Sequence, residues 1–110
     1  MRRLNRRMVL EGPVAAPDGG GGGRVTWIAR GTLWAAVEPS MGAERAGESL
    51  TLSGVPVRVF VRGAPVGSPA RPRPEDRFTE GGRVFRILSV TEADADATYL
   101  VCQAREEVVA

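Results

Sequence analysis

The sequence predicts an all-β fold, a small antiparallel β-barrel or β-sandwich of about six strands with one short helix or long loop. Three observations support this prediction. Apolar residues occur in short runs, glycine, proline and aspartate separate these runs, and no window of about 15 residues shows sustained helical spacing. Short strands with short connections are typical of small barrels and sandwiches. At 110 residues the chain has the length of one domain, and we treat residues 1–110 as a single unit.

The first predicted strand covers residues 6–11, where Met8 and Leu10 lie on one face of an alternating pattern. Gly12-Pro13 is expected to end it. The glycine-rich segment 18–23 follows, and the consecutive glycines within it have high backbone entropy and no side chains to pack. We predict a flexible loop or hairpin end there, without the spacing of a phosphate-binding loop.

The next two predicted strands, residues 25–29 and 32–38, are rich in β-branched and aromatic side chains. Gly31 is expected to separate them. Each strand carries one tryptophan, Trp27 or Trp34, which places the two indoles on different strands. We expect them in the core or at contacts between subunits rather than in a base-stacking surface.

Residues 40–53 are the ambiguous part of the chain. Ser40 is a candidate helix cap, but Gly42 and Gly47 each cost about 1 kcal/mol relative to alanine inside a helix. Without a sustained apolar stripe, an isolated helix here is marginal. We expect a short helix or a mobile loop that is stabilised only by contact with something else.

Residues 57–62 form the clearest predicted strand, because valines alternate strictly with Arg58, Phe60 and Arg62. Aromatic and arginine side chains are enriched at protein interfaces. Phe60 therefore either belongs to an interface or packs under a neighbouring loop.

The proline-rich segment 63–74 is expected to be an extended surface loop, because proline fits neither a helix interior nor a central strand. Its Arg71 and Arg73 lie next to prolines, and we expect their guanidinium groups to be exposed. They either contact a phosphate or a partner carboxylate, or they remain solvated.

Two further strands, residues 83–90 and 98–105, complete the predicted set. The glycines in residues 80–82 predict a hairpin turn before the first of them. Residues 92–97 are expected to form an acidic turn before the second. Cys102 lies in the middle of this last strand with apolar neighbours, and we expect a buried thiol.

The composition excludes several classes of site. The chain has no histidine, one cysteine, and arginine at all 15 basic positions. Catalytic triads, the usual zinc sites, internal disulfides and Schiff-base lysines are therefore excluded. Two carboxylate pairs, Glu75-Asp76 and Asp94-Asp96, remain as candidates for acid–base chemistry, and both are expected on surface turns. We expect no enzyme activity, no cofactor and no metal.

The net charge of +2 is small, but its distribution is uneven. Residues 1–11 carry four arginines and one glutamate, whereas residues 92–110 carry five carboxylates and one arginine. The two ends are expected to pair with each other, to pair between copies, or to stay solvated. No apolar run approaches the roughly 20 residues needed to span a bilayer, and we recognise no export signal. We expect no membrane contact and assembly in the cytoplasm.

The order of these features resembles the phage head–tail joining family, the head-closure or stopper proteins of tailed phages. The resemblance extends from Arg3 to Arg105. It rests on residues 4–11, the strand of Trp27, residues 33–39, 57–62 and 82–90, and the closing strand that ends near Cys102. The arginine-only composition and the small size also look like the versions found in gene transfer agents, which are phage-derived particles.

The resemblance implies a structural protein without catalytic residues. It implies a homo-oligomeric ring, with six copies favoured, between a portal or adaptor protein on the head side and a tail terminator or tail tube on the tail side. Such a ring closes the DNA-filled head, lets DNA pass through its channel and docks the tail. Its location is then the neck of a virion or phage-like particle that is assembled in the bacterial cytoplasm.

The resemblance also suggests two sets of site residues. Segment 40–56 corresponds by order to the family loop that reaches into the channel, and its expected channel residues are Met41, Glu44, Arg45, Glu48 and Leu50. The expected ring or partner interface comprises Arg6, Arg7, Trp34, Arg58, Phe60, Arg62, Arg71 and Arg73. A near-neutral chain without lysine clusters suits a surface along which DNA slides rather than binds.

The alternative is a small β-barrel that binds nucleic acid. In that case aromatic side chains stack on bases among the arginines, and the candidates are Trp27, Trp34, Phe60 and Tyr99. Only 5% of the residues are aromatic, and they are scattered over separate predicted strands. We therefore favour the connector.

Overall fold

The computed structural model describes residues 3–17, 19–20, 22–40 and 54–107, which form an all-β fold. The six strands are β1 (Arg6–Pro17), β2 (Gly23–Pro39), β3 (Val55–Arg62), β4 (Arg77–Glu80), β5 (Arg83–Glu92) and β6 (Tyr99–Glu106). The described residues contain no helix. The predicted fold class is therefore confirmed. Most of the ambiguous segment, residues 41–53, lies outside the described part. The end of the predicted channel loop 40–56, at Val55 and Pro56, belongs to β3.

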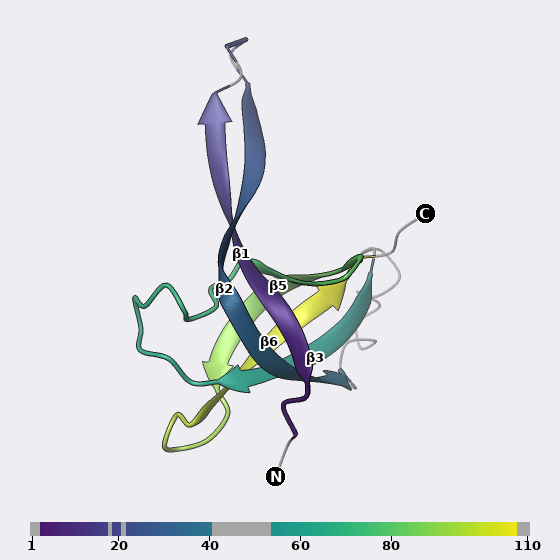
Figure 1. Cartoon of the computed structure of the whole chain (residues 1–110), viewed down its shortest axis with the longest axis vertical. Helices are drawn as coiled ribbons and strands as arrows, with labels where there is room; N and C mark the ends of the chain where they lie inside the picture. Colours follow the sequence, from purple (N-terminus) through teal and green to yellow (C-terminus); the bar gives the residue numbers. More distant parts are fainter. Residues whose placement is uncertain (1–2, 18, 21, 41–53, 108–110) are drawn as a thin grey trace, which may run out of the picture.

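The strands form a closed barrel in the order β1-β2-β3-β6-β5-β4, with antiparallel pairing throughout (Figure 1). Closure depends on a short contact in which residues 9–11 of β1 pair with β4. In the closed barrel every strand pairs with a neighbour on each side over at least part of its length, which leaves little strand edge exposed in the wall. The barrel itself is thus a self-sufficient unit.

The number of strands agrees with the prediction, but two assignments were wrong. The predicted strands 25–29 and 32–38 are one continuous strand, β2, so Trp27 and Trp34 lie on the same strand. Gly31 does not break it. It stays in the strand with a φ of 148°, a conformation that residues with a Cβ rarely adopt. The strand β4 completes the set of six, and the sequence pattern did not indicate it.

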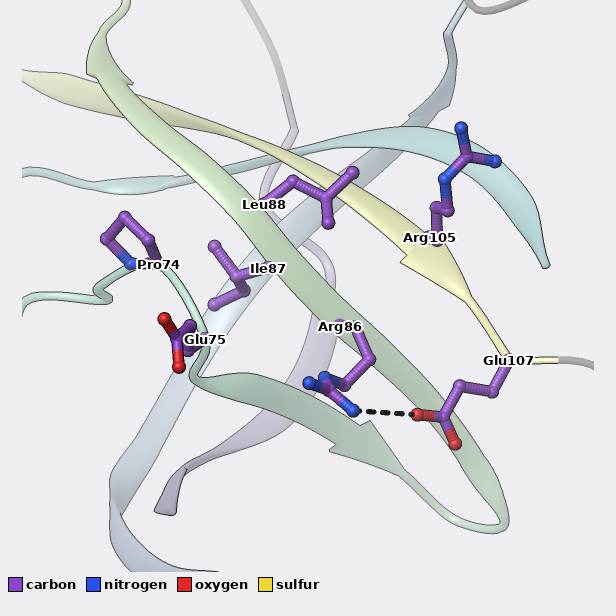
Figure 2. A pocket seen from close by; sticks show the side chains of 7 residues that line it. All are labelled: Pro74, Glu75, Arg86, Ile87, Leu88, Arg105 and Glu107. Atoms are coloured by element: carbon purple, nitrogen blue, oxygen red, sulfur yellow. Dashed lines mark ion pairs between the residues drawn. The ribbon is translucent and has the colours of Figure 1, made fainter. Parts of the chain in front are cut away.

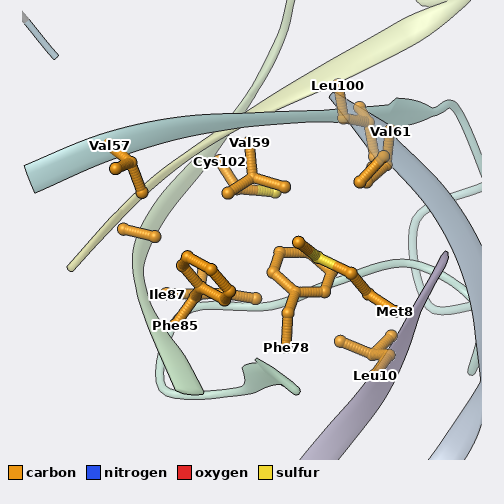
Figure 3. Packing of buried hydrophobic residues seen from close by; sticks show 12 residues of the cluster. Met8, Leu10, Val57, Val59, Val61, Phe78, Phe85, Ile87, Leu100 and Cys102 are labelled. Carbon is orange, nitrogen blue, oxygen red and sulfur yellow. The ribbon is translucent and has the colours of Figure 1, made fainter. Parts of the chain in front are cut away.

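The core fills the inside of the barrel with alternate side chains from all six strands (Figure 3). The largest fully buried apolar side chains are Phe78, Phe85, Met8, Leu10, Ile87 and Leu100. Each such side chain contributes about 1.5–3 kcal/mol by its removal from water. Cys102 is also buried, as predicted, and burial raises the pKa of its thiol to about 12.

The alternation along β3 is confirmed, with one detail that the sequence left open. Val57, Val59 and Val61 belong to the core cluster. Phe60 points to the other side of the sheet, yet it is only 3% exposed, and the Arg58 guanidinium lies over its ring at 5.7 Å. Of the two alternatives for Phe60, burial within the chain is the one observed.

The first hairpin extends far beyond the barrel. The prediction that Gly12-Pro13 ends the first strand was wrong, because β1 continues to Pro17 and pairs with β2 as far as Gly23. Figure 1 shows this extension as a two-stranded ribbon that projects from one end of the barrel. We call it the arm and define it as residues 12–17 of β1 and 23–29 of β2.

Candidate assembly surfaces

The arm leaves the barrel at a β-bulge. Leu10 pairs with Gly31 and Glu11 pairs with Ala29, so Arg30 is an extra residue in β2 at this step. A bulge bends its strand and redirects the side chain of the extra residue. Here it sends the Arg30 side chain to a position where it can bridge the arm and the loop before β4.

Arg30 forms the most deeply buried ion pair among the described residues. Its guanidinium donates to the Asp76 carboxylate, with side-chain exposures of 13% and 3%. The same guanidinium donates to the carbonyl oxygens of Pro69 at 3.1 Å and Arg71 at 2.7 Å. It therefore clamps the proline-rich loop onto the base of the arm. Gly12 permits this approach, because a Cβ there would lie 3.2 Å from the Arg30 side chain.

Two expectations for this loop need correction. Asp76 was expected on a surface turn but is buried, and it accepts hydrogen bonds from Arg30 and from the backbone N–H of Arg73. Arg71 was expected to expose its guanidinium but is half-buried, and it donates to the Ala64 carbonyl at 3.0 Å. Arg73 is exposed, as predicted, with 65% of its side chain accessible.

A second set of contacts fixes the base of the arm. The ring of Trp27 lies beneath the guanidinium groups of Arg77, at 4.1 Å, and Arg86, at 5.6 Å. Arg77 also donates to the Glu11 carboxylate at 2.7 Å. Cation–π contacts of this kind contribute about 0.5–1 kcal/mol each. Contacts with β4 and β5 thus hold the base of the arm and fix the direction in which the arm projects.

Beyond this base the arm is apolar and exposed. Val14, Val25 and Ile28 have exposed fractions of 43%, 56% and 53%. From residue 12 to residue 29 the sequence contains only two charged residues, Asp18 and Arg24. In the described residues each strand of the arm has only the other as a neighbour, so both outer edges are unpaired. Within the described residues, the arm therefore combines exposed apolar side chains with strand edges that have no partner in the chain.

An apolar groove lies along β2 on the barrel. β2 pairs with β3 only from Ala35 onward, and the edge before it faces the proline-rich loop. The hollow there has a volume of about 450 Å³ and is lined by Leu4, Leu33, Trp34, Arg62, Gly63, Ala64 and Ala70. A smaller hollow of about 50 Å³ continues it past Gly31 and Thr32. We call this feature the edge groove. Trp34, which is 54% exposed, lies in its wall.

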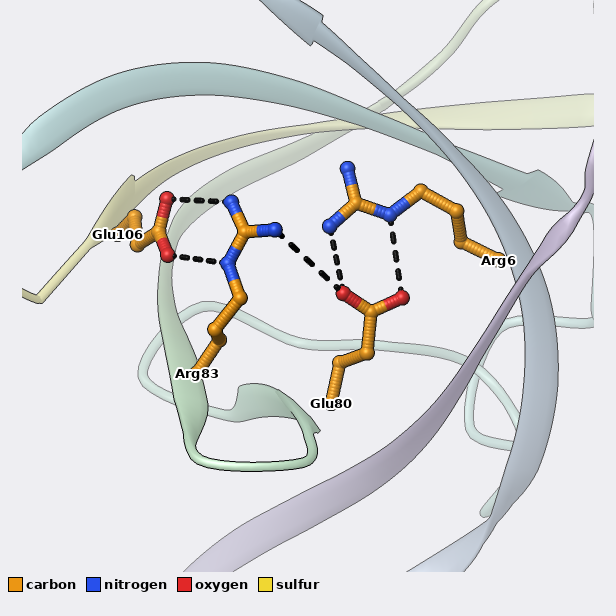
Figure 4. A network of polar contacts seen from close by, with 4 residues as sticks. All are labelled: Arg6, Glu80, Arg83 and Glu106. Carbon is orange, nitrogen blue, oxygen red and sulfur yellow. Dashed lines mark hydrogen bonds and ion pairs between the residues drawn. The ribbon is translucent and has the colours of Figure 1, made fainter.

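A polar network joins four strands at the rim of the barrel (Figure 4). Arg6 donates to Glu80 at 2.5 and 3.1 Å, and Arg83 donates to Glu106 at 2.6 and 2.9 Å. Arg83 also lies 3.8 Å from Glu80, which links the two pairs. The hydrogen bonds from the arginines lower the pKa values of Glu80 and Glu106. Arg6 of the basic N-terminal segment and Glu106 of the acidic C-terminal segment thus belong to one network, but each pairs with a residue of β4 or β5 and not with the opposite end of the chain.

A second hollow, of about 580 Å³, lies beside β5 and β6 (Figure 2). It combines two arginines, two glutamates and apolar side chains, and its lining residues are Pro74, Glu75, Arg86, Ile87, Leu88, Arg105 and Glu107. Arg86 and Glu107 approach within 3.8 Å, as the dashed line in Figure 2 marks. This mixture of charges favours neither an anion nor a cation.

The predicted interface residues do not form one surface. Arg6 is engaged with Glu80, and Arg58 contacts Glu38 at 3.2 Å. Arg62 lies over the ring of Tyr99 at 5.8 Å, at the end of β3 next to the edge groove. Arg7 is exposed. The five predicted channel residues, Met41, Glu44, Arg45, Glu48 and Leu50, lie outside the described residues.

The aromatic residues named for nucleic-acid binding are engaged in contacts within the chain. Trp27 is covered by Arg77 and Arg86, and Phe60 is buried. Tyr99 is half-buried beneath Arg62. Only Trp34 presents an exposed ring. These positions do not provide the row of accessible rings that base stacking requires.

The sequence did not reveal the arm, its anchor or the edge groove. Arg30 and Asp76 are 46 residues apart, and no local pattern connects them. Val25 and Ile28 were read as ordinary strand residues. The only available signal was the scarcity of charge between residues 12 and 29.

Comparison with known proteins identifies the family. The family model described as phage head completion protein matches residues 1–107. The chain belongs to this family. The predicted resemblance to head-closure proteins is therefore confirmed. Head completion proteins are structural and non-enzymatic, which agrees with the expectation that neither Glu75-Asp76 nor Asp94-Asp96 is a catalytic pair.

Two solved structures resemble this head completion family member along most of its length. A chain of the structure "Virion of native gene transfer agent (GTA) particle" is 56% identical, with a TM-score of 0.81 and complete coverage of both chains. The solution structure of protein SF1141 from Shigella flexneri 2a is 26% identical, with a TM-score of 0.66 and coverage of 94% of this chain and 93% of that one. A search of curated proteins finds no match.

Two further properties bear on the site. No group of three or more potential metal ligands occurs in the part of the chain that the structure describes. The same part contains no helix of the length and apolarity that a membrane crossing requires.

Proposed function

We propose that this protein is a head–tail connector of a gene transfer agent or related phage-like particle. In this role it forms a homo-oligomeric ring, with six copies the favoured number, at the neck of the particle. The ring lies between a portal or adaptor protein and a tail terminator or tail tube, closes the DNA-filled head and docks the tail. The observation that carries the proposal is 56% identity, over the whole length of both chains, to a chain of a native GTA virion.

The physical properties of the chain suit a structural part of a particle. The barrel is closed, its core is complete and most of the charges on its wall are paired within the chain. Closure ties each strand to a neighbour on each side, which suits a structural part that has to keep its shape in an assembled particle. The exposed arm then leaves one part free for contacts with other molecules.

We propose further that segment 40–56 lines the DNA channel. Pro39 pairs with Val57, so the residues that flank the segment lie side by side at one end of the barrel. Its sequence mixes Glu44, Arg45 and Glu48, and this low net charge favours sliding of DNA over binding. Reversing Glu44 and Glu48 to arginine is expected to slow DNA release from particles. Unchanged release kinetics would contradict the channel assignment.

Exposed arginines are proposed to contact the neighbouring rings. Arg7 is the best candidate for such a contact, because it is exposed, whereas the neighbouring Arg6 is already paired with Glu80. Arg7→Glu is expected to reduce the yield of tailed particles without changing the stability of the isolated chain. Arg6→Glu is a matched comparison that also breaks the rim network. Normal assembly with Arg7→Glu would remove this contact from the proposal.

The direct test of the connector role is a particle-producing strain that lacks this protein. The expected products are DNA-filled heads without tails, which lose their DNA, together with free tails. Supplying the protein in trans is expected to restore tailed particles, with the added mass at the neck in electron micrographs. Normal tailed particles in its absence would refute the proposal.

A further inference from the structure

We propose that the arm of one copy docks into the edge groove of the next copy and thereby builds the ring. The inference rests on the proposed function and adds the surfaces that perform it. Its occupant is a second copy of this chain, on both sides of the contact.

The first argument is that the arm is held outward although its surface favours burial. A two-stranded ribbon alone in water is marginally stable at best, and unpaired edges invite contact with other chains. Two anchors, the Arg30–Asp76 pair and the stack of Trp27 on Arg77, nevertheless fix its base. Val14, Val25 and Ile28 remain about half exposed. A rigid apolar projection of this kind is prepared for a binding partner.

The second argument is that the same chain carries a matching recess elsewhere. The edge groove is lined mainly by Leu4, Leu33, Trp34, Ala64 and Ala70. The arm cannot enter the groove of its own chain, because it points away from the barrel and from the loop that forms the groove wall (Figure 1). A protrusion and a recess at different places on one chain give a heterologous contact. Such contacts repeat from copy to copy and close into a ring when the rotation between successive copies divides a full turn.

The third argument is charge. Among the described arm residues only Arg24 is charged, and it lies at the outer end of the ribbon. The only charged residue in the larger hollow of the groove is Arg62, which is already stacked on Tyr99. Docking therefore buries no unpaired carboxylate. With Arg24 as the one basic side chain among its described residues, the arm is also poorly suited to a nucleic acid, because binding to phosphates depends on several basic side chains.

The size of the contact predicts how the ring forms. Six residue pairs span about 20 Å, and two strands are about 10 Å wide, so one face of the arm covers roughly 200 Å². A standard interface buries about 800 Å² on each partner. One arm contact is therefore too small for a stable dimer. A closed ring, in which each copy gives and receives an arm, gains from the high effective concentration of linked contacts.

The test is cross-linking within assembled particles. Val25→Cys in the arm and Ala70→Cys in the groove are combined in one chain, and purified tailed particles are treated with a short bis-maleimide. Cys102 does not compete, because it is fully buried. The expected result is a ladder of covalent multimers of this chain on a denaturing gel.

The matched control combines Leu88→Cys with Ala70→Cys, because Leu88 is 54% exposed, close to the 56% of Val25, and lies on the barrel wall. This pair is expected to give no ladder. The proposal is overturned by an equal ladder from the control, by linkage of Val25→Cys to a different protein, or by no linkage in particles that contain the chain. These outcomes would leave the proposed connector role unaffected. Absence of the chain from tailed particles overturns both.

A second variant gives an independent measurement. Val25→Glu combined with Ile28→Glu places charge on the arm, whereas Leu88→Glu places it on the barrel. The arm variant is expected to lower the yield of tailed particles at least tenfold with an unchanged melting temperature, and Leu88→Glu is expected to leave the yield unchanged. Equal yields from the two variants would overturn the docking contact.

Discussion

The barrel and the arm are made from the same two strands, yet they differ in almost every physical property. In the barrel, β1 also pairs with β4 and β2 also pairs with β3 over part of their lengths, Met8 and Leu10 are buried, and Arg6 and Glu11 have ionic partners. Beyond the bulge at Arg30 they pair only with each other and expose apolar side chains. A single extra residue thus separates the part of the hairpin that belongs to the barrel wall from the part whose apolar side chains and strand edges are exposed.

The comparison shows where stability and assembly reside. Substitutions in the barrel and at the anchor are expected to change the free energy of unfolding. Substitutions along the arm and in the edge groove are expected to change the yield of particles instead. The following four predictions test this division.

The largest effect on stability is expected at the anchor. Asp76→Asn removes the charge that compensates the buried Arg30 guanidinium, and breaking a buried pair costs about 3 kcal/mol. Chemical denaturation measures this change. Glu75→Gln is the matched control, because this neighbouring carboxylate is exposed, and its expected change is below about 0.5 kcal/mol. Equal effects of the two variants would mean that the anchor adds nothing.

The two tryptophans of β2 are expected to separate the roles. Trp27→Ala removes two cation–π contacts and is expected to lower the free energy of unfolding by about 1–2 kcal/mol. Trp34→Ala removes a half-exposed side chain, and its expected effect on stability is below about 0.5 kcal/mol. Trp34→Ala is nevertheless expected to lower the yield of tailed particles. The opposite ranking in thermal unfolding would reverse the assignment.

The rim network is expected to give a smaller effect that depends on pH. The pKa values of Glu80 and Glu106 are lower in the folded chain than the ordinary value of 4.5, because arginines donate to their ionised forms. The contribution of the two carboxylates to the free energy of unfolding is therefore complete at pH values above their ordinary pKa. It is lost as the pH falls through their lowered pKa values in the folded chain. For partly exposed pairs it amounts to less than about 1 kcal/mol. Denaturation curves between pH 7 and pH 3 measure it.

Glu106→Gln is the variant for this measurement. It is expected to flatten the loss of stability at acidic pH, because the folded chain then no longer holds this carboxylate in its ionised form. Glu92→Gln, in an exposed position at the end of β5, is the control. An unchanged acid profile for Glu106→Gln would show that the network does not contribute to stability.

The smallest effect on stability is expected on the arm. Val25→Glu is expected to change the free energy of unfolding by less than about 0.5 kcal/mol, because Val25 is 56% exposed and lies outside the core. A thermal unfolding scan measures this value. A loss of several kcal/mol would show that the arm is part of the cooperative unit of the barrel, and the distinction between the two regions would fail.

The sequence predicted the fold class, five of the strands in outline and the buried thiol, because these depend on local alternation and turn residues. Met8, Leu10 and the valines of β3 are inside as expected. The strand β4 was missed, because residues 77–80 are too few and too polar for a pattern. Phe78, in its middle, is nevertheless fully buried.

The composition alone also excluded sites that need histidine or lysine, and the order of the residues determined the resemblance to the head-closure family. Only the tertiary structure decided that β2 is continuous, that Arg30 reaches Asp76, and that an apolar arm and an apolar groove lie apart on one chain. The physical reason is distance along the chain. Alternation and turns act between near neighbours, whereas the bulge, the ion pair and the groove depend on residues that meet only after the barrel closes.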